Sequence, residues 1–180
     1  MLSTDNSPNT VTREGSCDVS ELVLGLSSHN GVERQSARED LVSMGGSVVP
    51  QLIQCLSDPR RQVRWEAAKA LGQIGDPAAA TALVGAIEDK DGDVRWLAAV
   101  GLAGMGRQGL PPLLAALIEH SDSQWLREGA HHVCHDLAKT ADGRIVQPVL
   151  DALNAEEPEL TAPGAAYSAL TALQPALGKS

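Results

Sequence analysis

The sequence predicts an all-α fold: a right-handed α-α superhelix in which about four helix pairs stack side by side between single capping helices. The main observation is an internal repeat, because equivalent arginines recur 30, 31 and 32 residues apart, at Arg34, Arg64, Arg95 and Arg127. Periods of this length are typical of stacked supersecondary units. A second observation is that the apolar residues inside each unit follow helical spacing. The third is composition, since the chain has no Phe and its small residues favour close helix packing.

Each unit contains two apolar runs that predict two helices. In the clearest unit Val63, Ala67 and Leu71 follow the spacing of a single helix face. A second run over residues 79–87 carries Leu83 and Ile87 at the same kind of spacing. The unit is therefore expected to be a pair of antiparallel helices.

Glycine and aspartate mark the expected ends of these helices. Glycine follows the first run of three units and is expected there in the left-handed conformation that ends a helix, at Gly45, Gly75 and Gly106. Aspartate precedes several runs and is expected to cap their N-termini, at Asp58, Asp76 and Asp91.

The polar ends of the chain define the expected domain boundaries. Residues 1–18 are expected to be a disordered tail, residues 19–174 the repeat domain, and residues 175–180 a flexible C-terminus. Within the domain we expect a lone helix near residues 19–26, four helix pairs, and a terminal helix near residues 163–173. The two single helices would cap the apolar faces of the end repeats.

Composition excludes several classes of protein. The net charge of −9 disfavours nucleic acid as a partner, and the small basic group of Arg60, Arg61 and Arg64 is expected to be a solvated helix start. No segment approaches the roughly 20 apolar residues that span a bilayer, so no membrane association is expected. Three widely spaced cysteines suggest no disulfide framework, which predicts a cytoplasmic location.

The best-formed unit resembles a known family. Its residues 63–77, Val-Arg-Trp-Glu-Ala-Ala-Lys-Ala-Leu-Gly-Gln-Ile-Gly-Asp-Pro, followed by Leu83, Ile87 and Val94-Arg95, are similar to the HEAT-like repeats of the phycobilisome-lyase type. The resemblance covers residues 19–174 and implies an α-solenoid. Members of this family include bilin lyases, a di-iron hydroxylase and bacterial adaptors, so the resemblance identifies the fold and leaves the function open.

The resemblance also implies a ladder of ion pairs between adjacent repeats. Its basic rungs would be Arg34, Arg64, Arg95 and Arg127, and its acceptors would be Asp58, Asp91 and Asp122. Such a ladder is structural, because it fixes the register of neighbouring repeats.

Histidines cluster in the fourth unit, which reads His131-His132-Val133-Cys134-His135-Asp136. His131 and His135 are four residues apart on one helix face, a spacing that suits Zn or Ni. The alternatives are a pH-sensitive interface or ordinary hydrogen bonds toward the last repeat. The family's hydroxylase requires His-Glu dyads, and no His here precedes Glu.

Candidate partner contacts come from tryptophan and from the second helices. Trp65 and Trp96 occupy equivalent positions, where they could form a binding strip or pack over neighbouring arginines. Trp125 has no counterpart and is the better candidate for an exposed contact. Gln54 and Thr81 lie on second helices, which are expected to line a shallow concave groove.

We therefore interpret the chain as a non-catalytic scaffold that binds another protein or peptide, with no cofactor. The alternatives are a bilin-lyase-like subunit that acts on a tetrapyrrole or phycobiliprotein, and a metal- or pH-responsive module built on His131 and His135. The sequence offers no nucleophile with a base, no convergent carboxylates and no phosphate-binding loop.

Overall fold

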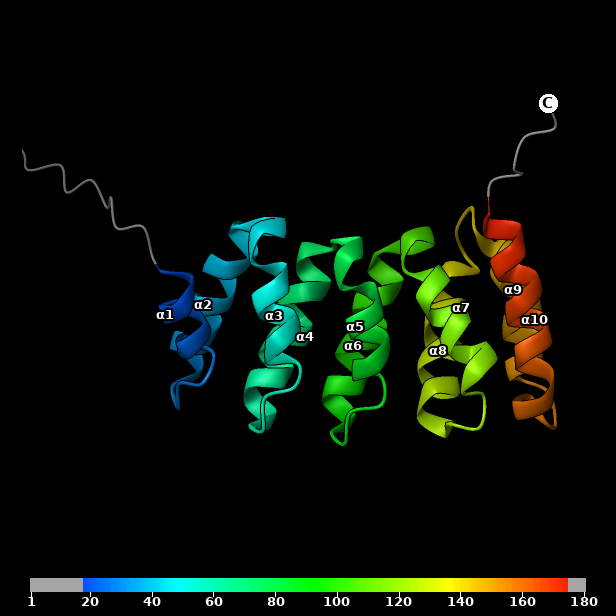
Figure 1. Ribbon diagram of the computed structural model, residues 1–180, viewed down its shortest axis with the longest axis horizontal. Coiled ribbons are helices and arrows are strands. Elements are labelled where there is room, and N and C mark those ends of the chain that lie inside the picture. The colour runs from blue at the N-terminus through cyan, green and yellow to red at the C-terminus, as the bar shows by residue number, and fades with distance from the viewer. Residues whose placement is uncertain (1–17, 175–180) are drawn as a thin grey trace, which may run out of the picture.

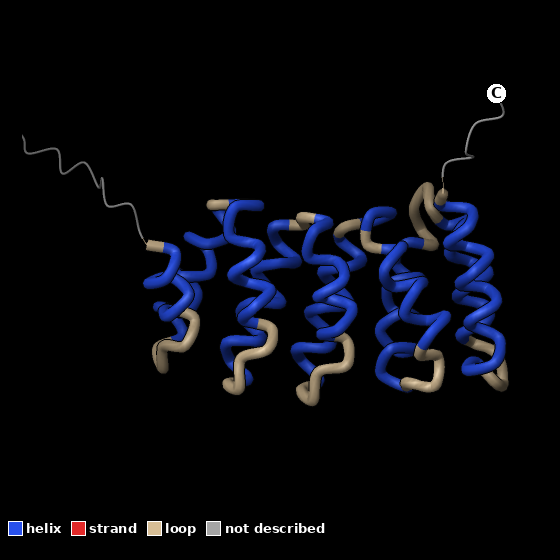
Figure 2. The backbone as a smooth tube through the Cα atoms, viewed as in Figure 1, coloured by secondary structure: helices blue, strands red, loops and turns tan. Residues whose placement is uncertain are grey.

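The computed structural model describes residues 18–174 as helices joined by short loops, with no strand in that range (Figure 1, Figure 2). The predicted tail at residues 1–18 lies outside this range apart from Asp18, and so does the predicted C-terminus at residues 175–180. The α-helices are α1 (Val19–Gly25), α2 (Gly31–Ser43), α3 (Val49–Cys55), α4 (Arg61–Ile74), α5 (Ala80–Ala86), α6 (Gly92–Gly104), α7 (Leu110–Glu119), α8 (Gln124–Leu137), α9 (Gly143–Leu153) and α10 (Pro158–Leu173). The all-α solenoid predicted from the repeat is confirmed.

The helices group differently from the prediction. Each even-numbered helix packs on the helix before it, so that α1 pairs with α2, α3 with α4, and α5 with α6, and these hairpins stand side by side in Figure 1. The lone N-terminal helix is therefore not a single cap but the first member of a hairpin. The terminal helix begins at Pro158, so Pro163 lies inside it and does not start it.

Two layers run along the solenoid, and their order reverses at the last hairpin. Helices α2, α4, α6 and α8 pack on one another in sequence and form one layer. Helix α9 then packs on α8, while α10 packs on α7, so the final hairpin enters the layers in the opposite order. The predicted order of four helix pairs followed by a terminal helix would place α9 in the same layer as α7, whereas the contacts place α10 there.

The predicted helix ends are largely confirmed. Gly45, Gly75 and Gly106 have positive φ values of 62°, 68° and 58°, as expected for glycine after a helix. Short 3-10 turns follow these residues or include them, at Gly45–Val48, Pro77–Ala79 and Gly106–Gln108.

Two of the three predicted aspartate caps are confirmed. The side chain of Asp76 accepts the amide of Ala78, and that of Asp91 accepts the amide of Val94. Asp58 does not cap α4, because its carboxylate is engaged by Arg60, which itself occupies the N-cap position.

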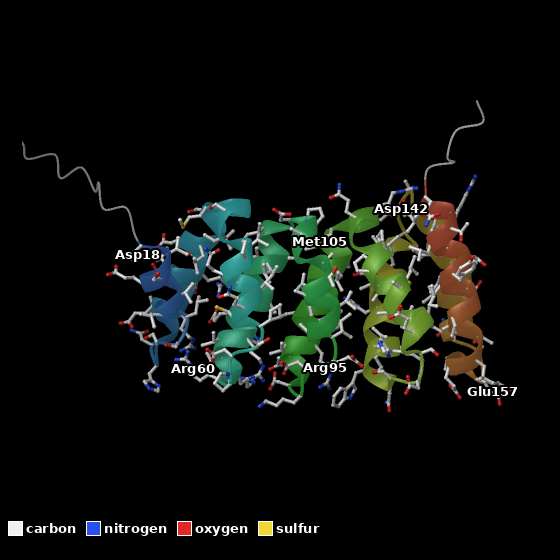
Figure 3. The ribbon with its side chains drawn as sticks, in the orientation of Figure 1. Asp18, Arg60, Arg95, Met105, Asp142 and Glu157 are labelled. Atoms are coloured by element: carbon white, nitrogen blue, oxygen red, sulfur yellow. The ribbon has the colours of Figure 1, made fainter. Side chains whose placement is uncertain are left out.

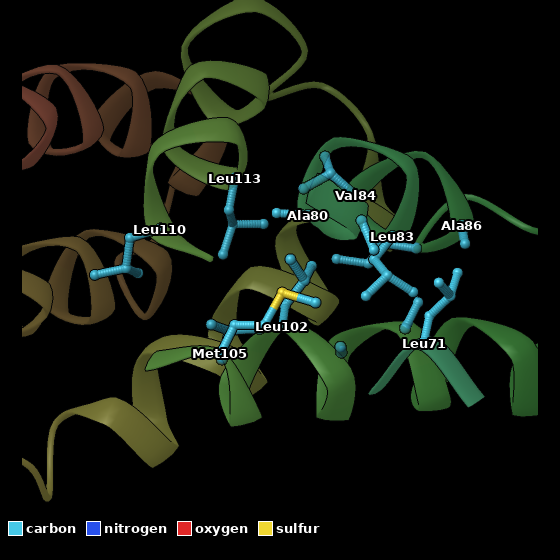
Figure 4. Close-up of a cluster of buried hydrophobic side chains, with 14 of the residues drawn as sticks. Leu71, Ala80, Leu83, Val84, Ala86, Leu102, Met105, Leu110 and Leu113 are labelled. Carbon is cyan, nitrogen blue, oxygen red and sulfur yellow. The ribbon is translucent and has the colours of Figure 1, made fainter. Parts of the chain in front are cut away.

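One continuous apolar core runs through the hairpins. Figure 4 shows its central part, where leucines from α4, α5, α6 and α7 meet. Small residues set the spacing: a Cβ on Gly72 of α4 would lie 3.0 Å from the Cα of Gly101 on α6, and the reverse is also true. The two helices therefore approach more closely than side chains would permit, which explains how a core without Phe can be packed.

Cys134 is expected to resist alkylation while the protein is folded. It is buried in α8, and this burial raises the pKa of its thiol to about 12. Since the thiolate is the reactive form, iodoacetamide at pH 8 should leave Cys134 unmodified in buffer and label it in urea. Peptide mapping by mass spectrometry measures both states, and equal labelling rates would contradict the burial.

Candidate functional site

A hollow of about 270 Å³ lies between α6 and α8 and brings together two of the predicted contact residues. It is lined by Ile87, Gly92, Arg95, Trp96, Ala99, Trp125, Glu128, Gly129 and His132. Trp96 and Trp125 come from neighbouring repeats, and their side chains reach the same space because successive helices of this layer are adjacent. The sequence predicted each tryptophan separately and did not predict that the two would converge.

The floor of the hollow depends on a glycine. A Cβ on Gly129 would lie 2.5 Å from the Cγ2 atom of Ile87, so helix α8 can pack here only without a side chain. Ile87 is fully buried and supplies an apolar base.

The two tryptophans are held by different neighbours. Trp96 is 56% exposed, and its ring lies against that of His132, with 4.2 Å between ring centroids and 39° between planes. Trp125 is 43% exposed, and the guanidinium of Arg95 lies over its ring, with the Cζ atom 4.5 Å from the ring centroid. Both tryptophans therefore keep apolar area in contact with solvent while each ring also contacts a side chain of the neighbouring repeat.

The remaining predicted contact residues lie elsewhere. Trp65 lines a separate polar hollow between α2 and α4, with the Nζ of Lys69 4.7 Å from its ring centroid. Gln54 lines an open groove between α1 and α3, and Thr81 is exposed on α5. The three tryptophans and the two polar residues thus do not form one continuous strip.

The repeat arginines make one bond in common. The Nη1 group of each donates to the backbone carbonyl six residues earlier, in the loop that precedes its helix. The pairs are Arg34 with Ser28 (2.8 Å), Arg64 with Asp58 (2.9 Å), Arg95 with Asp89 (2.8 Å) and Arg127 with Ser121 (2.5 Å). This bond connects each of the four loops to the helix that follows it. Arg60 and Arg95, labelled in Figure 3, lie at the edge of the molecule where these loops are found.

The acidic acceptors predicted for this ladder are wrong. Arg64 pairs with the carboxylate of Asp89, at 2.6 Å, and not with Asp58 or Asp91. The prediction chose Asp91, which lies two residues after the true acceptor. Asp89 belongs to the loop before α6, whereas Asp91 is the N-cap residue of that helix. Asp91 pairs instead with Arg61, at 2.5 Å, and Asp122 is exposed and forms no ion pair within residues 18–174.

The basic group at the start of α4 is neutralised by nearby acids. Arg60 pairs with Asp58 at 2.8 Å, and this hydrogen bond lowers the pKa of the Asp58 carboxyl to about 2. Arg61 contacts both Asp91 and Asp93. No unopposed basic patch is therefore available here to a phosphate backbone.

Comparison with known proteins agrees with this architecture. A family profile described as HEAT repeats matches residues 19–103 and again residues 49–134. The chain belongs to the HEAT-repeat family. A search of curated proteins gave no match.

One solved structure similar to this HEAT-repeat chain is the crystal structure of an engineered protein. The two are 21% identical, with 86% of this chain and 78% of that chain covered, at a TM-score of 0.42.

His131 and His135 of this HEAT-repeat protein have no third metal-binding side chain beside them within residues 18–174. The His131 and His135 rings are nearly parallel, with centroids 6.3 Å apart, and the Nε2 of His131 lies 3.1 Å from the Oδ1 of Asn154. Among residues 18–174 no group of three His, Cys, Asp or Glu side chains could hold an ion. The hydrogen bond between His131 and Asn154 agrees with the alternative that this pair makes ordinary hydrogen bonds toward the last repeat.

A buried charge cluster was missed by sequence reasoning. Glu66 of α4 accepts from Arg38 at 2.5 Å and from Arg34 at 3.3 Å, both on α2. Glu66 and Arg38 are almost completely buried. The available signal was the acid two residues after Arg64, where the next HEAT repeat has Leu97.

No helix within residues 18–174 has both the length and the apolar character that a bilayer crossing requires.

Proposed function

We propose that this HEAT-repeat protein is a non-catalytic scaffold and that it binds another protein through the hollow between α6 and α8. The observation that supports this proposal is the pair of tryptophans, Trp96 and Trp125, which are both exposed and line the same hollow. Tryptophan is enriched among residues that dominate binding energy, and such residues cluster in pockets. HEAT repeats in general mediate protein interactions, which supports the same conclusion.

Replacing Trp96 and Trp125 together with alanine is expected to lower the amount of bound partner at least tenfold. The reason is that loss of two aromatic anchors typically removes more than 2 kcal/mol of binding free energy. The measurement is affinity capture from the native cell, with bound proteins quantified by mass spectrometry.

The matched control for this double variant is Tyr167→Ala, because Tyr167 is 65% exposed but lies on α10, away from the hollow. The control should retain the partner. A partner that is lost equally from both variants, or from neither, would contradict the proposal.

Two alternatives remain as predictions from the sequence. Bilin-lyase activity of the phycobilisome-lyase type would produce a change in visible absorbance when the protein is mixed with a bilin. Regulation through His131 and His135 would produce a rise in melting temperature at saturating zinc. The cytoplasmic location inferred from the cysteines also stays a prediction.

A further inference from the structure

The repeat arginines differ in how their remaining guanidinium edge is satisfied. Arg34 places its Nε 3.3 Å from Glu66, and Arg64 places its Nε and Nη2 on the carboxylate of Asp89. Arg95 has the same bond to its loop carbonyl but forms no ion pair within residues 18–174. Its Nη2 lies 3.5 Å from the Cβ position of Gly92, and the Nη2 of Arg34 has the same separation from that of Gly31, so the side chains are placed alike.

The missing carboxylate can be traced to two positions. Asp89 lies six residues before Arg95, and the equivalent position before Arg127 is Ser121. Glu66 lies two residues after Arg64, and the equivalent position after Arg127 is Gly129. These two positions supply the acids that pair with Arg64 and Arg34. In the repeat that follows Arg95 the same positions hold Ser121 and Gly129, so neither can supply an acid to Arg95.

One of these two positions, Gly129, lines the hollow. Arg95 lies over the ring of Trp125 in the same hollow, and Trp96 also lines it. A guanidinium edge beside apolar rings attracts a carboxylate more strongly than it would in open water, because the local dielectric constant is lower. Glu128 is the one acid that lines the hollow, and its carboxylate accepts from Gln124 at 2.8 Å.

We propose that the hollow between α6 and α8 binds an acidic side chain of a partner, whose carboxylate pairs with Arg95 while an adjacent apolar side chain packs on Trp96 and Trp125. The partner thus supplies the carboxylate that Asp89 supplies to Arg64 one repeat earlier. This inference rests on the proposed scaffold function and names the chemistry of the segment bound.

The probe is an acetylated and amidated hexapeptide of sequence Gly-Leu-Asp-Leu-Asp-Gly, with twins that carry Asn or Lys in place of Asp. Binding is followed by NMR through the three tryptophan indole N–H signals, each assigned by a Trp→Phe variant. The acidic peptide should shift the Trp96 and Trp125 signals, leave that of Trp65 in place, and bind roughly tenfold more tightly than the Asn twin.

Ser121→Asp tests the inference within the chain, because it restores the acid found at position 89. The new carboxylate should pair with Arg95, weaken the acidic peptide roughly tenfold and raise the melting temperature. Ser121→Ala is the matched control, since the Oγ of Ser121 donates to the carbonyl of Glu159 and both substitutions remove this bond. Glu128→Gln should strengthen binding of the acidic peptide, because it removes a like charge from the hollow.

The outcomes separate this inference from the proposed function. Preference for the Lys twin, or equal binding of all three peptides, would overturn the acidic specificity while leaving the hollow as a protein-binding site. Equal affinity of Ser121→Asp and Ser121→Ala for the acidic peptide would also overturn it. Failure of every peptide to shift the Trp96 and Trp125 signals would overturn the inference, whereas the scaffold function is tested separately, by whether the double tryptophan variant loses a partner that Tyr167→Ala retains.

Discussion

Replacing Glu66 with alanine is expected to lower the free energy of unfolding by about 3–5 kcal/mol. The carboxylate is 4% exposed and is the only acid that pairs with Arg34 or Arg38 within the described residues. Removing it leaves the guanidinium of Arg38, which is 7% exposed, without an ionic partner. The Nε of Arg38 already lacks a hydrogen-bond partner when Glu66 is present. An uncompensated buried charge is among the most costly defects in a folded protein.

Urea denaturation followed by circular dichroism measures this loss. The control is Arg107→Ala, since Arg107 forms an exposed ion pair with Asp142 at 3.4 Å and should contribute no more than about 1 kcal/mol. A second variant, Arg38→Leu with Glu66→Leu, should recover much of the stability because it replaces the buried pair with apolar groups. If Glu66→Ala costs no more than Arg107→Ala, the cluster does not stabilise the α2–α4 packing.

Replacing Leu83 with alanine is expected to cost about 2–5 kcal/mol of unfolding free energy. Leu83 lies on α5, is fully buried, and belongs to the cluster of leucines shown in Figure 4. Its Cδ1 atom would lie 3.2 Å from a Cβ on Gly101, so the side chain fills the space beside the closest approach of α4 and α6. Truncation leaves a cavity that two closely packed helices cannot collapse to fill.

The same denaturation experiment tests this second effect. Leu24→Ala is the matched control, because Leu24 is 66% exposed and its truncation should change the unfolding free energy by less than about 0.5 kcal/mol. Similar costs for the two variants would show that the core does not depend on Leu83.

Local features of the fold could be predicted from the sequence because each depends on neighbouring residues. The positive φ values of Gly45, Gly75 and Gly106 follow from glycine at the end of an apolar run. The reversal at α9 and α10 could not be predicted in this way. Layer order depends on how whole helices pack, and the apolar run of α9 is compatible with either layer.

In the candidate site, too, some features depend on neighbouring residues and could be predicted, whereas others depend on how the helices pack. Exposure of Trp125 could be predicted because it stands apart from the repeat pattern, whereas its convergence with Trp96 depends on the spacing between α6 and α8. The acceptor of Arg64 was missed because a shift of two residues along a loop does not alter the sequence pattern. Glu66 was missed because its partners come from the preceding repeat, about 30 residues away.

The close contact between Gly72 and Gly101 has a mechanical consequence. Helices α4 and α6 touch backbone to backbone, whereas α6 and α8 are separated at the hollow by indole and imidazole rings. The interface between α4 and α6 is therefore closed at this point, whereas the interface between α6 and α8 contains the hollow. We expect bending of the array to concentrate at the α6–α8 interface, so that a molecule bound in the hollow would restrict it.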